Sequence, residues 1–279
     1  MSWLDLLSVL LRASSFVLMF QAAGAAFFAA WQGGMLGASL TPIARLSATS
    51  AWSAMAVVLA DGLLAPARMA GELAGVLDPS LLKLAFLSGD GAAWVLRLAG
   101  LALMVPGRAR LALAGALLVL ASFVLTGHTV THELRWLLAA LLAVHVAAVM
   151  FWLGSLEPLI QVLKMETAAR AHDVIGRFSH WAGWVVAALF LAALGMAAAL
   201  LPGPAALLTP YGALLLTKLA GFTSLLVLAS LNRWRLAPAI GKSSPQAARA
   251  FIRVVRLEQL LIVGVLLATS VMTSWFSPS

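Results

Sequence analysis

The sequence predicts an all-α, polytopic membrane protein in which residues 1–279 form a single transmembrane domain of about eight helices. The chain is 63% hydrophobic and only 10% charged, and its mean hydropathy is +1.02, whereas soluble domains carry about 25% charged residues. Apolar stretches of about 20 residues recur along it, each long enough to cross a hydrocarbon core of about 30 Å as a helix. Because backbone groups in lipid must be satisfied within the segment, these stretches are expected to be helical.

Turn-forming residues separate the expected spans. Val105-Pro106-Gly107 ends the third span, and LPGPAALLTP at 201–210 separates the sixth from the seventh, because Pro and Gly interrupt helices. The first span lacks a basic start and a small-residue cleavage site, so we expect it to be retained. The expected spans are residues 10–31, 43–62, 91–106, 110–127, 134–158, 177–201, 210–231 and 251–275.

Lysine and arginine gather in alternate loops, and the loop after the sixth span and the C-terminal tail carry none. Positively charged loops stay in the cytoplasm, so both termini are expected to be periplasmic. The net charge of +8 then reflects topology, and no nucleic-acid partner is predicted. The basic residues concerned are Arg108, Arg110, Lys164, Arg170, Arg177, Arg233, Arg235, Lys242, Arg249, Arg253 and Arg256.

The longest outer segment, residues 63–90, contains LDPSLLKLAFLSGD. Asp78 followed by Pro79 is typical of a helix N-cap with Pro at the first helical position. A short amphipathic helix on the lipid surface is therefore expected here. The chain has no cysteine, which excludes disulfides, thiolate metal ligands and a catalytic thiol.

Three of the five histidines lie in TGHTVTHELRWLLAALLAVHVAAVM, residues 126–150. His128 and His132, with Glu133, are expected at the periplasmic mouth between the fourth and fifth spans. His145 lies about 16 Å into the fifth span, too deep for its ring to reach water. An interhelical hydrogen bond would explain His145 alone. Together the three histidines favour a metal path, an entry site above a deeper site, because imidazole suits copper and zinc.

Two basic side chains fall inside expected spans, where ionisable residues are rare and are functional candidates. Arg97 and Lys218 both lie in the outer halves of their spans. They are expected either to extend toward water or to pair with Asp61, Asp90 or Glu133. A direct role in a permeation path is the alternative.

Two acidic residues lie toward the cytoplasmic ends of their spans. Glu258 is two residues from Arg256 and five from Arg253, so a structural ion pair is expected. Glu157 precedes Pro158 at the end of its span and is expected to be solvated.

Several stretches, in order along most of the chain from about residue 90, resemble the copper resistance D family, the inner-membrane CopD or PcoD type. The first ninety residues are similar only in general character, and Ser14, Ser15 and Gln21 stand in the first span where the family has a histidine. The matching pieces are AWVLR at 93–97, GH at 127–128, HVAAVMFWLGSLEPL at 145–159, RFS at 177–179, TPYGALLLTK at 209–218, LNRWRLAP at 231–238 and RVVRLEQLL at 253–261.

The resemblance implies a bacterial inner-membrane protein that takes up copper with a periplasmic CopC-type partner. It implies that His128 and His145 are the family's recurrent histidines, and that Arg97, Lys218 and Asn232 are its recurrent polar positions. In the path we expect, copper enters at His128 and His132, with Cu(I) favoured, and reaches His145. Trp152, seven residues after His145 and on the same helix face, then lies toward the exit.

Two other classes of function stay open at the level of sequence. A haem b electron-transfer protein would need two axial ligands at equal depth, and the histidines differ in depth. The second class is a copper sensor or assembly protein that does not transport the metal. Enzyme chemistry is not expected, because HExxH, G-x-S-x-G and P-loop motifs are missing.

Overall fold

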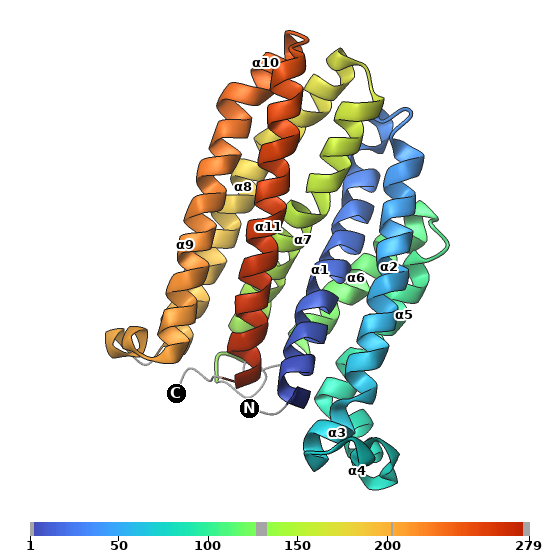
Figure 1. The fold of residues 1–279 in the computed structure, drawn as a ribbon, viewed down its shortest axis with the longest axis vertical. Coiled ribbons are helices and arrows are strands. Elements are labelled where there is room, and N and C mark those ends of the chain that lie inside the picture. Colours follow the sequence, from blue (N-terminus) through green and yellow to red (C-terminus); the bar gives the residue numbers. More distant parts are fainter. Residues whose placement is uncertain (1–2, 127–132, 202, 276–279) are drawn as a thin grey trace.

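The structure is a computed structural model that describes residues 3–126, 133–201 and 203–275, and these residues form helices and turns without a strand (Figure 1). A π-helical turn, Asn232–Leu236, joins α9 to α10 into one continuous stretch. The helices are α1 (Trp3–Gln32), α2 (Leu40–Leu63), α3 (Ala65–Ala70), α4 (Pro79–Leu87), α5 (Gly89–Met104), α6 (Ala109–Val124), α7 (Arg135–Met165), α8 (Ala168–Leu200), α9 (Pro210–Leu231), α10 (Ala237–Gly241) and α11 (Pro245–Trp275). Short 3-10 turns lie at Gly33–Met35, Leu73–Leu77 and Pro204–Leu208.

The all-helical architecture predicted from composition is confirmed for the described residues, and the expected spans fall on helices. Within the described residues, five stretches are long and apolar enough to cross a bilayer, and α4 with α5 would make a sixth if this pair, bent by 75°, is one span. Helix α6 is a shorter apolar helix of 16 residues. The total of eight crossings stays a prediction. The five stretches are Trp3–Met35, Leu40–Ala70, Arg135–Met165, Ala168–Leu200 and Pro210–Gly241.

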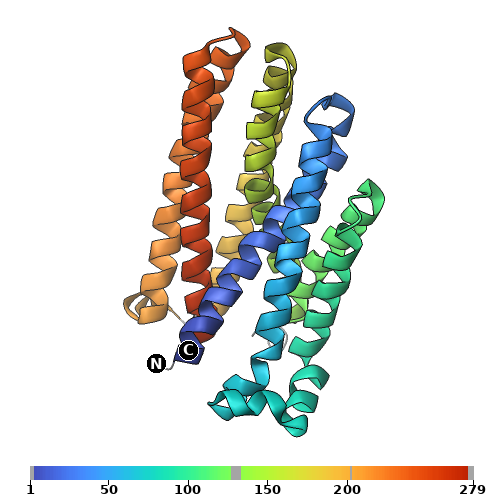
Figure 2. The same cartoon turned by 45° about the vertical axis from the view of Figure 1, so that its right-hand side comes forward.

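The long helices stand side by side with two distinct ends (Figures 1 and 2). Helix α1 begins and α11 ends at one end, which also carries α3 and α4 and is called the terminal end below. The turns from α1 to α2, α7 to α8 and α10 to α11 lie at the other, the turn end. Basic residues lie near the turn end, for example Lys164 in the last turn of α7 and Lys242 between α10 and α11. Their position agrees with the charge pattern on which the expected orientation depends.

Helix α1 lies at the centre of the bundle, against α2, α6, α7 and α11. It crosses α7 at Gly24 and Gly154, where the two backbones touch and neither position has room for a Cβ atom. The amide of Gln21 donates to the carbonyl of Gly154 at 3.2 Å in the same place. Small residues at membrane helix crossings allow such close approach, so this crossing fixes α7, which carries His145.

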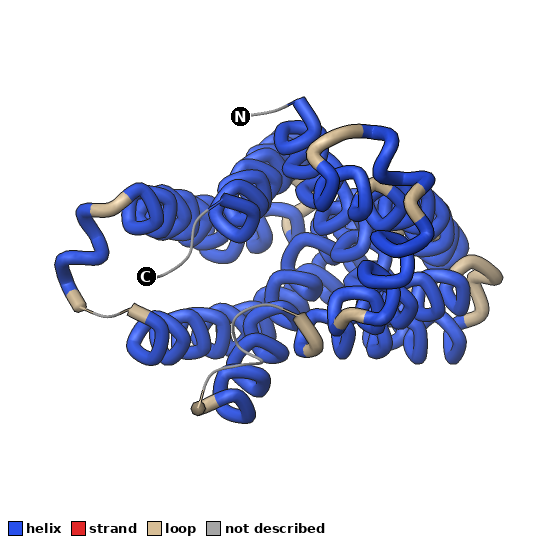
Figure 3. Tube along the Cα trace, turned by 90° about the horizontal axis from the view of Figure 1, so that it is seen from below, coloured by secondary structure: helices blue, strands red, loops and turns tan. Residues whose placement is uncertain are grey.

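Helix α9 lies at the edge of the bundle, beside α11 (Figure 3). Only Gly212 and Leu225 of its residues are buried. Many of its other side chains are exposed and available to lipid, as expected of an apolar helix at the edge of a bundle.

The segment from 63 to 90 contains the predicted short helix, α4. This helix begins as expected, with Asp78 as its N-cap and Pro79 as its first residue. The carboxylate of Asp78 accepts hydrogen bonds from the backbone N–H groups of Ser80 and Leu81, at 2.8 and 3.3 Å. Leu84 and Leu87 are 61% and 75% exposed. These exposed leucines suit the lipid surface, and that location stays a prediction.

Candidate functional site

His145 is placed on α7 ten residues after the helix begins, about 15 Å along its axis. Its ring is half-buried, and its Nδ1 atom is buried without a hydrogen-bond partner among the described residues. Buried polar side-chain atoms normally have a partner, and leaving one unpaired costs about 1–3 kcal/mol. The fold therefore leaves an imidazole nitrogen available for a ligand in the interior of the bundle.

Two neighbouring helices face the His145 ring. The backbone of Leu189 on α8 interacts with it, and the side chain of Lys218 on α9 acts on it electrostatically. Lys218 is half-buried and forms no ion pair within the part of the chain that the structure describes. The expected pairing of Lys218 with an acid is therefore not seen. The structure instead brings Lys218 and His145 into one neighbourhood.

The outer histidines of the proposed path, His128 and His132, lie outside the described residues. Glu133, the next residue, is exposed in the turn before α7. Among residues 3–126, 133–201 and 203–275, no three His, Asp or Glu side chains form a group able to hold a metal ion. His145 is thus a single candidate ligand rather than part of a chelating cluster.

Arg97 lies within α5, and its guanidinium group interacts with two neutral side chains rather than with an acid. Its Nε atom donates to the hydroxyl of Ser122 on α6 at 3.1 Å, and its guanidinium lies over the ring of Phe123, 4.8 Å from the centroid. A cation over an aromatic face is attracted by the ring quadrupole. No ion pair joins Arg97 to an acid in the described residues, so this expected pairing is also not seen.

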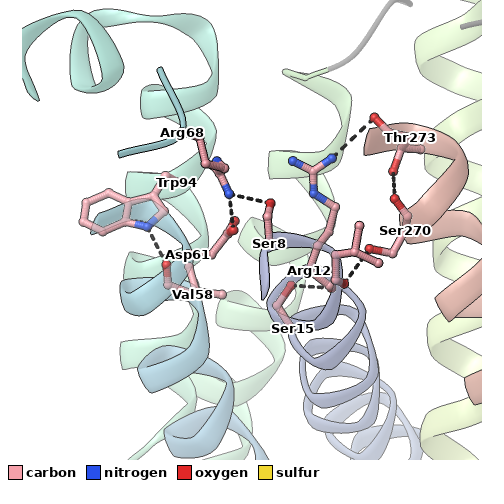
Figure 4. Close-up of polar contacts among 10 residues, drawn as sticks. Ser8, Arg12, Ser15, Val58, Asp61, Arg68, Trp94, Ser270 and Thr273 are labelled. Atoms are coloured by element: carbon pink, nitrogen blue, oxygen red, sulfur yellow. Dashed lines mark hydrogen bonds and ion pairs between the residues drawn. The ribbon is translucent and has the colours of Figure 1, made fainter. Parts of the chain in front are cut away.

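Asp61 pairs with Arg68 instead, at 2.7 Å, in a polar cluster at the terminal end (Figure 4). The same Arg68 atom donates to the hydroxyl of Ser8 at 2.7 Å, which ties α2 and α3 to α1. Ser270 of α11 donates to the carbonyl of Val9 at 2.8 Å. The cluster joins helices that are far apart in sequence and has no direct contact with His145.

Glu258 lies at a junction of three elements and is only 2% exposed. Its carboxylate accepts a hydrogen bond from the indole Nε1 of Trp152 on α7, at 3.2 Å. It accepts a second from the amide Nδ2 of Asn232, in the π-helical turn, at 2.7 Å. The structure thus brings together two residues that the sequence singles out, Trp152 and Asn232, around an acid for which the sequence predicts an ion pair.

The ion pair expected for Glu258 is therefore wrong, whereas Glu157 is partly exposed to solvent and also has an ion-pair partner. Arg256 pairs with Glu157 at 2.7 Å rather than with Glu258. Residues two positions apart on a helix point in different directions, so the Arg256 side chain is about half exposed while Glu258 is buried. Glu157, expected to be solvated, is the partner of Arg256 across this helix pair.

Sequence reasoning missed Glu166, which follows α7 in the turn to α8. Its carboxylate accepts from the backbone N–H groups of Gly37 and Ser39, at 2.8 and 2.9 Å, and from the Ser39 hydroxyl at 2.6 Å. Arg170 contributes an ion pair at 2.9 Å. The Glu166–Arg170 spacing of four is a recognisable local signal, but nothing in the sequence indicates the contacts with Ser39.

Glutamine in place of Glu166 is expected to lower the free energy of unfolding by about 2 kcal/mol near neutral pH, since hydrogen bonds to a charged group contribute about 1.5–3 kcal/mol. Burial acts to raise the pKa of this carboxyl, but the bonds from Ser39, Arg170 and Gly37 outweigh it and lower the pKa from 4.5 to about 2. A lowered folded-state pKa contributes stability above the unfolded value, which is lost as pH falls. Thermal unfolding in detergent should show the wild-type advantage shrinking between about pH 4.5 and about pH 2; a constant difference would contradict this role.

The described histidines do not pair across a haem. Leu189 is the α8 residue beside His145, and His180 on the same helix lies nine residues earlier, about 13 Å along the axis. His172 is bound through Nδ1 to the carbonyl of Ala237 at 3.2 Å. Two axial ligands must face one iron from opposite sides at one depth, so this geometry does not favour haem b.

Comparison with protein families gave two matches. Residues 3–135 match the copper resistance protein D-like N-terminal domain, and residues 172–272 match copper resistance protein D. A search of curated proteins and a search of solved structures gave no match. The two family matches follow one another along the chain and leave most of α7, with His145 and Trp152, between them. The chain belongs to the copper resistance D family.

Proposed function

We propose that this protein takes up copper across the inner membrane of a bacterium, with both termini in the periplasm, and that His145 is the internal copper ligand. The observation that carries the proposal is the buried, unpartnered Nδ1 atom of His145 in a chain of the copper resistance D family. Imidazole nitrogen is a ligand that copper accepts readily. Copper is the transported substrate here, and no enzymatic reaction is proposed.

The entry to this path is proposed at the terminal end. His128 and His132 precede α7, and Glu133 begins the turn that leads into it. A periplasmic copper-binding protein of the CopC type would deliver the metal to these histidines, as Cu(I). His145 lies about 15 Å further along α7, so it can receive the ion only after it has entered the bundle.

Lys218 makes His145 suitable for passage rather than storage. A transported ion must bind well enough to enter and weakly enough to leave. An ammonium group near the imidazole repels a bound copper cation, and this repulsion is strong where the dielectric constant is low. A single histidine beside a lysine therefore holds copper transiently. From there the ion would move toward Trp152 and the turn end.

Raised expression is expected to increase the copper content of bacterial cells several-fold when copper is supplied. Mass spectrometry of washed cells measures this content, and a reporter fused at Lys242 should report the cytoplasm. A fall in cell copper on expression would show export and contradict the proposal. A periplasmic reporter signal would reverse the proposed orientation.

A further inference from the structure

The carboxyl group of Glu258 lies in the interior of the bundle, and no basic side chain of the described residues forms an ion pair with it. Its two hydrogen-bond donors, the Trp152 indole and the Asn232 amide, are both neutral. Moving a carboxylate away from water without pairing it is costly, and such groups become neutral instead. These surroundings therefore favour the protonated, neutral form of this acid.

Within the described residues, no ion pair joins Glu258 to a basic residue of the elements around it. Helix α11 packs against α1, α7, α9, α10 and the π-helical turn. The single ion pair in this neighbourhood within the described residues joins Arg256 to Glu157, and Arg233 donates to the carbonyl of Ser179 at 2.8 Å. Lys218 lies fourteen residues before Asn232, about 21 Å along the helix. The remaining ionisable residues on these elements are Asp5 and Arg12 on α1, Arg135, His145 and Lys164 on α7, Arg235 in the π-helical turn, and Arg249 and Arg253 on α11.

Asn232 is equipped to accommodate both protonation states. Its Nδ2 atom donates to the carboxylate at 2.7 Å, while its Oδ1 atom is buried and has no partner in the described part of the chain. When the acid is protonated, rotation of the amide presents Oδ1 to the carboxyl O–H, which then donates to it. This rotation breaks the bond from Nδ2 and replaces it with one from the carboxyl O–H to Oδ1, so one hydrogen bond between the two side chains is kept in each state. The Trp152 indole can donate to the other carboxyl oxygen in both states.

The position of Asn232 supports a functional role for this arrangement. Asn232 begins the π-helical turn that joins α9 to α10, and π-helical turns within α-helices occur frequently at functional sites. Ionisable groups inside membrane spans commonly mark ion or proton pathways. The cluster joins α7, which carries His145, to α9, which carries Lys218.

We propose that Glu258 is a proton-binding site: its carboxylate takes up a proton from water, the resulting O–H donates a hydrogen bond to Oδ1 of Asn232, and the proton is later released to water. Binding forms the O–H bond of the carboxyl group, and release breaks it to leave the carboxylate and a hydrated proton. If the protein transports copper as proposed above, the proton is the coupling ion of that transport.

Infrared spectroscopy of the purified full-length protein tests the site without copper. The wild type should show the absorption of a protonated carboxyl group at mildly acidic pH, and it should disappear as the pH rises. Glu258→Gln should lose this absorption, Glu258→Asp should restore it at a shifted frequency, and Glu157→Gln should keep it as the matched control. The same carboxyl absorption in wild type and Glu258→Gln overturns the inference.

A second variant keeps the test decisive if Glu258→Gln does not fold. Asn232→Ala removes the acceptor and should shift both the frequency of the carboxyl absorption and the pH at which it disappears. An unchanged absorption in this variant also overturns the inference.

Liposomes containing the protein and a pH-sensitive dye separate this inference from the proposed function. With copper supplied as Cu(I), proton movement should accompany copper entry in the wild type and in Glu157→Gln, and should be lost in Glu258→Gln. Copper entry without proton movement overturns the coupling and leaves copper uptake intact. A titrating Glu258 in a protein that moves no copper supports the proton site and ends the uptake proposal.

Discussion

Alanine in place of His145 is expected to lower copper uptake at least about tenfold, because it removes the only interior imidazole nitrogen without a partner in the described residues. A tenfold loss equals about 1.4 kcal/mol of lost stabilisation along the path, which is modest for the removal of a metal ligand. The protein should still fold, since no hydrogen bond of Nδ1 is lost. Uptake of isotopically labelled copper into liposomes at equal protein content measures the effect.

Two variants show whether the effect belongs to the site. His180 is exposed on α8 and contacts Trp181, so His180→Ala should transport like the wild type. Lys218→Met should bind copper about tenfold more tightly and release it more slowly, because it removes the repelling ammonium. Normal uptake by His145→Ala, or weaker copper binding by Lys218→Met, would contradict the role given to His145.

Valine in place of Gly24 is expected to destabilise the fold by about 3 kcal/mol or more. A Cβ atom at this position meets the carbonyl oxygen of Met150 and the Cα atom of Gly154. These are backbone atoms, so α1 and α7 must move apart, and inserting bulk into a tight core costs about 1–3 kcal/mol even where side chains can yield. Thermal unfolding in detergent, with the yield of monodisperse protein, measures the loss.

Gly264 on α11 provides the matched control. It is also a helical glycine, but a Cβ atom there meets nothing within 4 Å. Gly264→Ala should therefore be neutral or stabilising by up to about 1 kcal/mol, from helix propensity alone. If both variants unfold at the wild-type temperature, the α1–α7 crossing is not the tight contact described above.

Helix positions were predictable because local signals determine them. Apolar stretches and the Pro and Gly residues between them predicted all eight long helices, and Asp78-Pro79 predicted the start of α4. The helices α7 and α8 extend beyond the expected spans at the turn end. Hydropathy marks the apolar core of a span, whereas polar helical turns outside it, such as the one containing Lys164, continue the same hydrogen bonding.

Partners of buried polar residues were not predictable, because they depend on how distant helices are placed. Arg97 and Asp61 each found a different partner, Ser122 and Arg68. Glu258 met Trp152, which is 106 positions away in the sequence, instead of an arginine on its own helix. The proximity of Lys218 to His145 also follows from tertiary packing alone.

X-ray scattering at the copper absorption edge, from crystals of the protein soaked with Cu(I), tests the central claim most directly. The account predicts an anomalous peak within bonding distance of the His145 Nδ1 atom, and no such peak in His145→Ala crystals. A copper-loaded protein whose peaks all lie away from this ring would contradict the account.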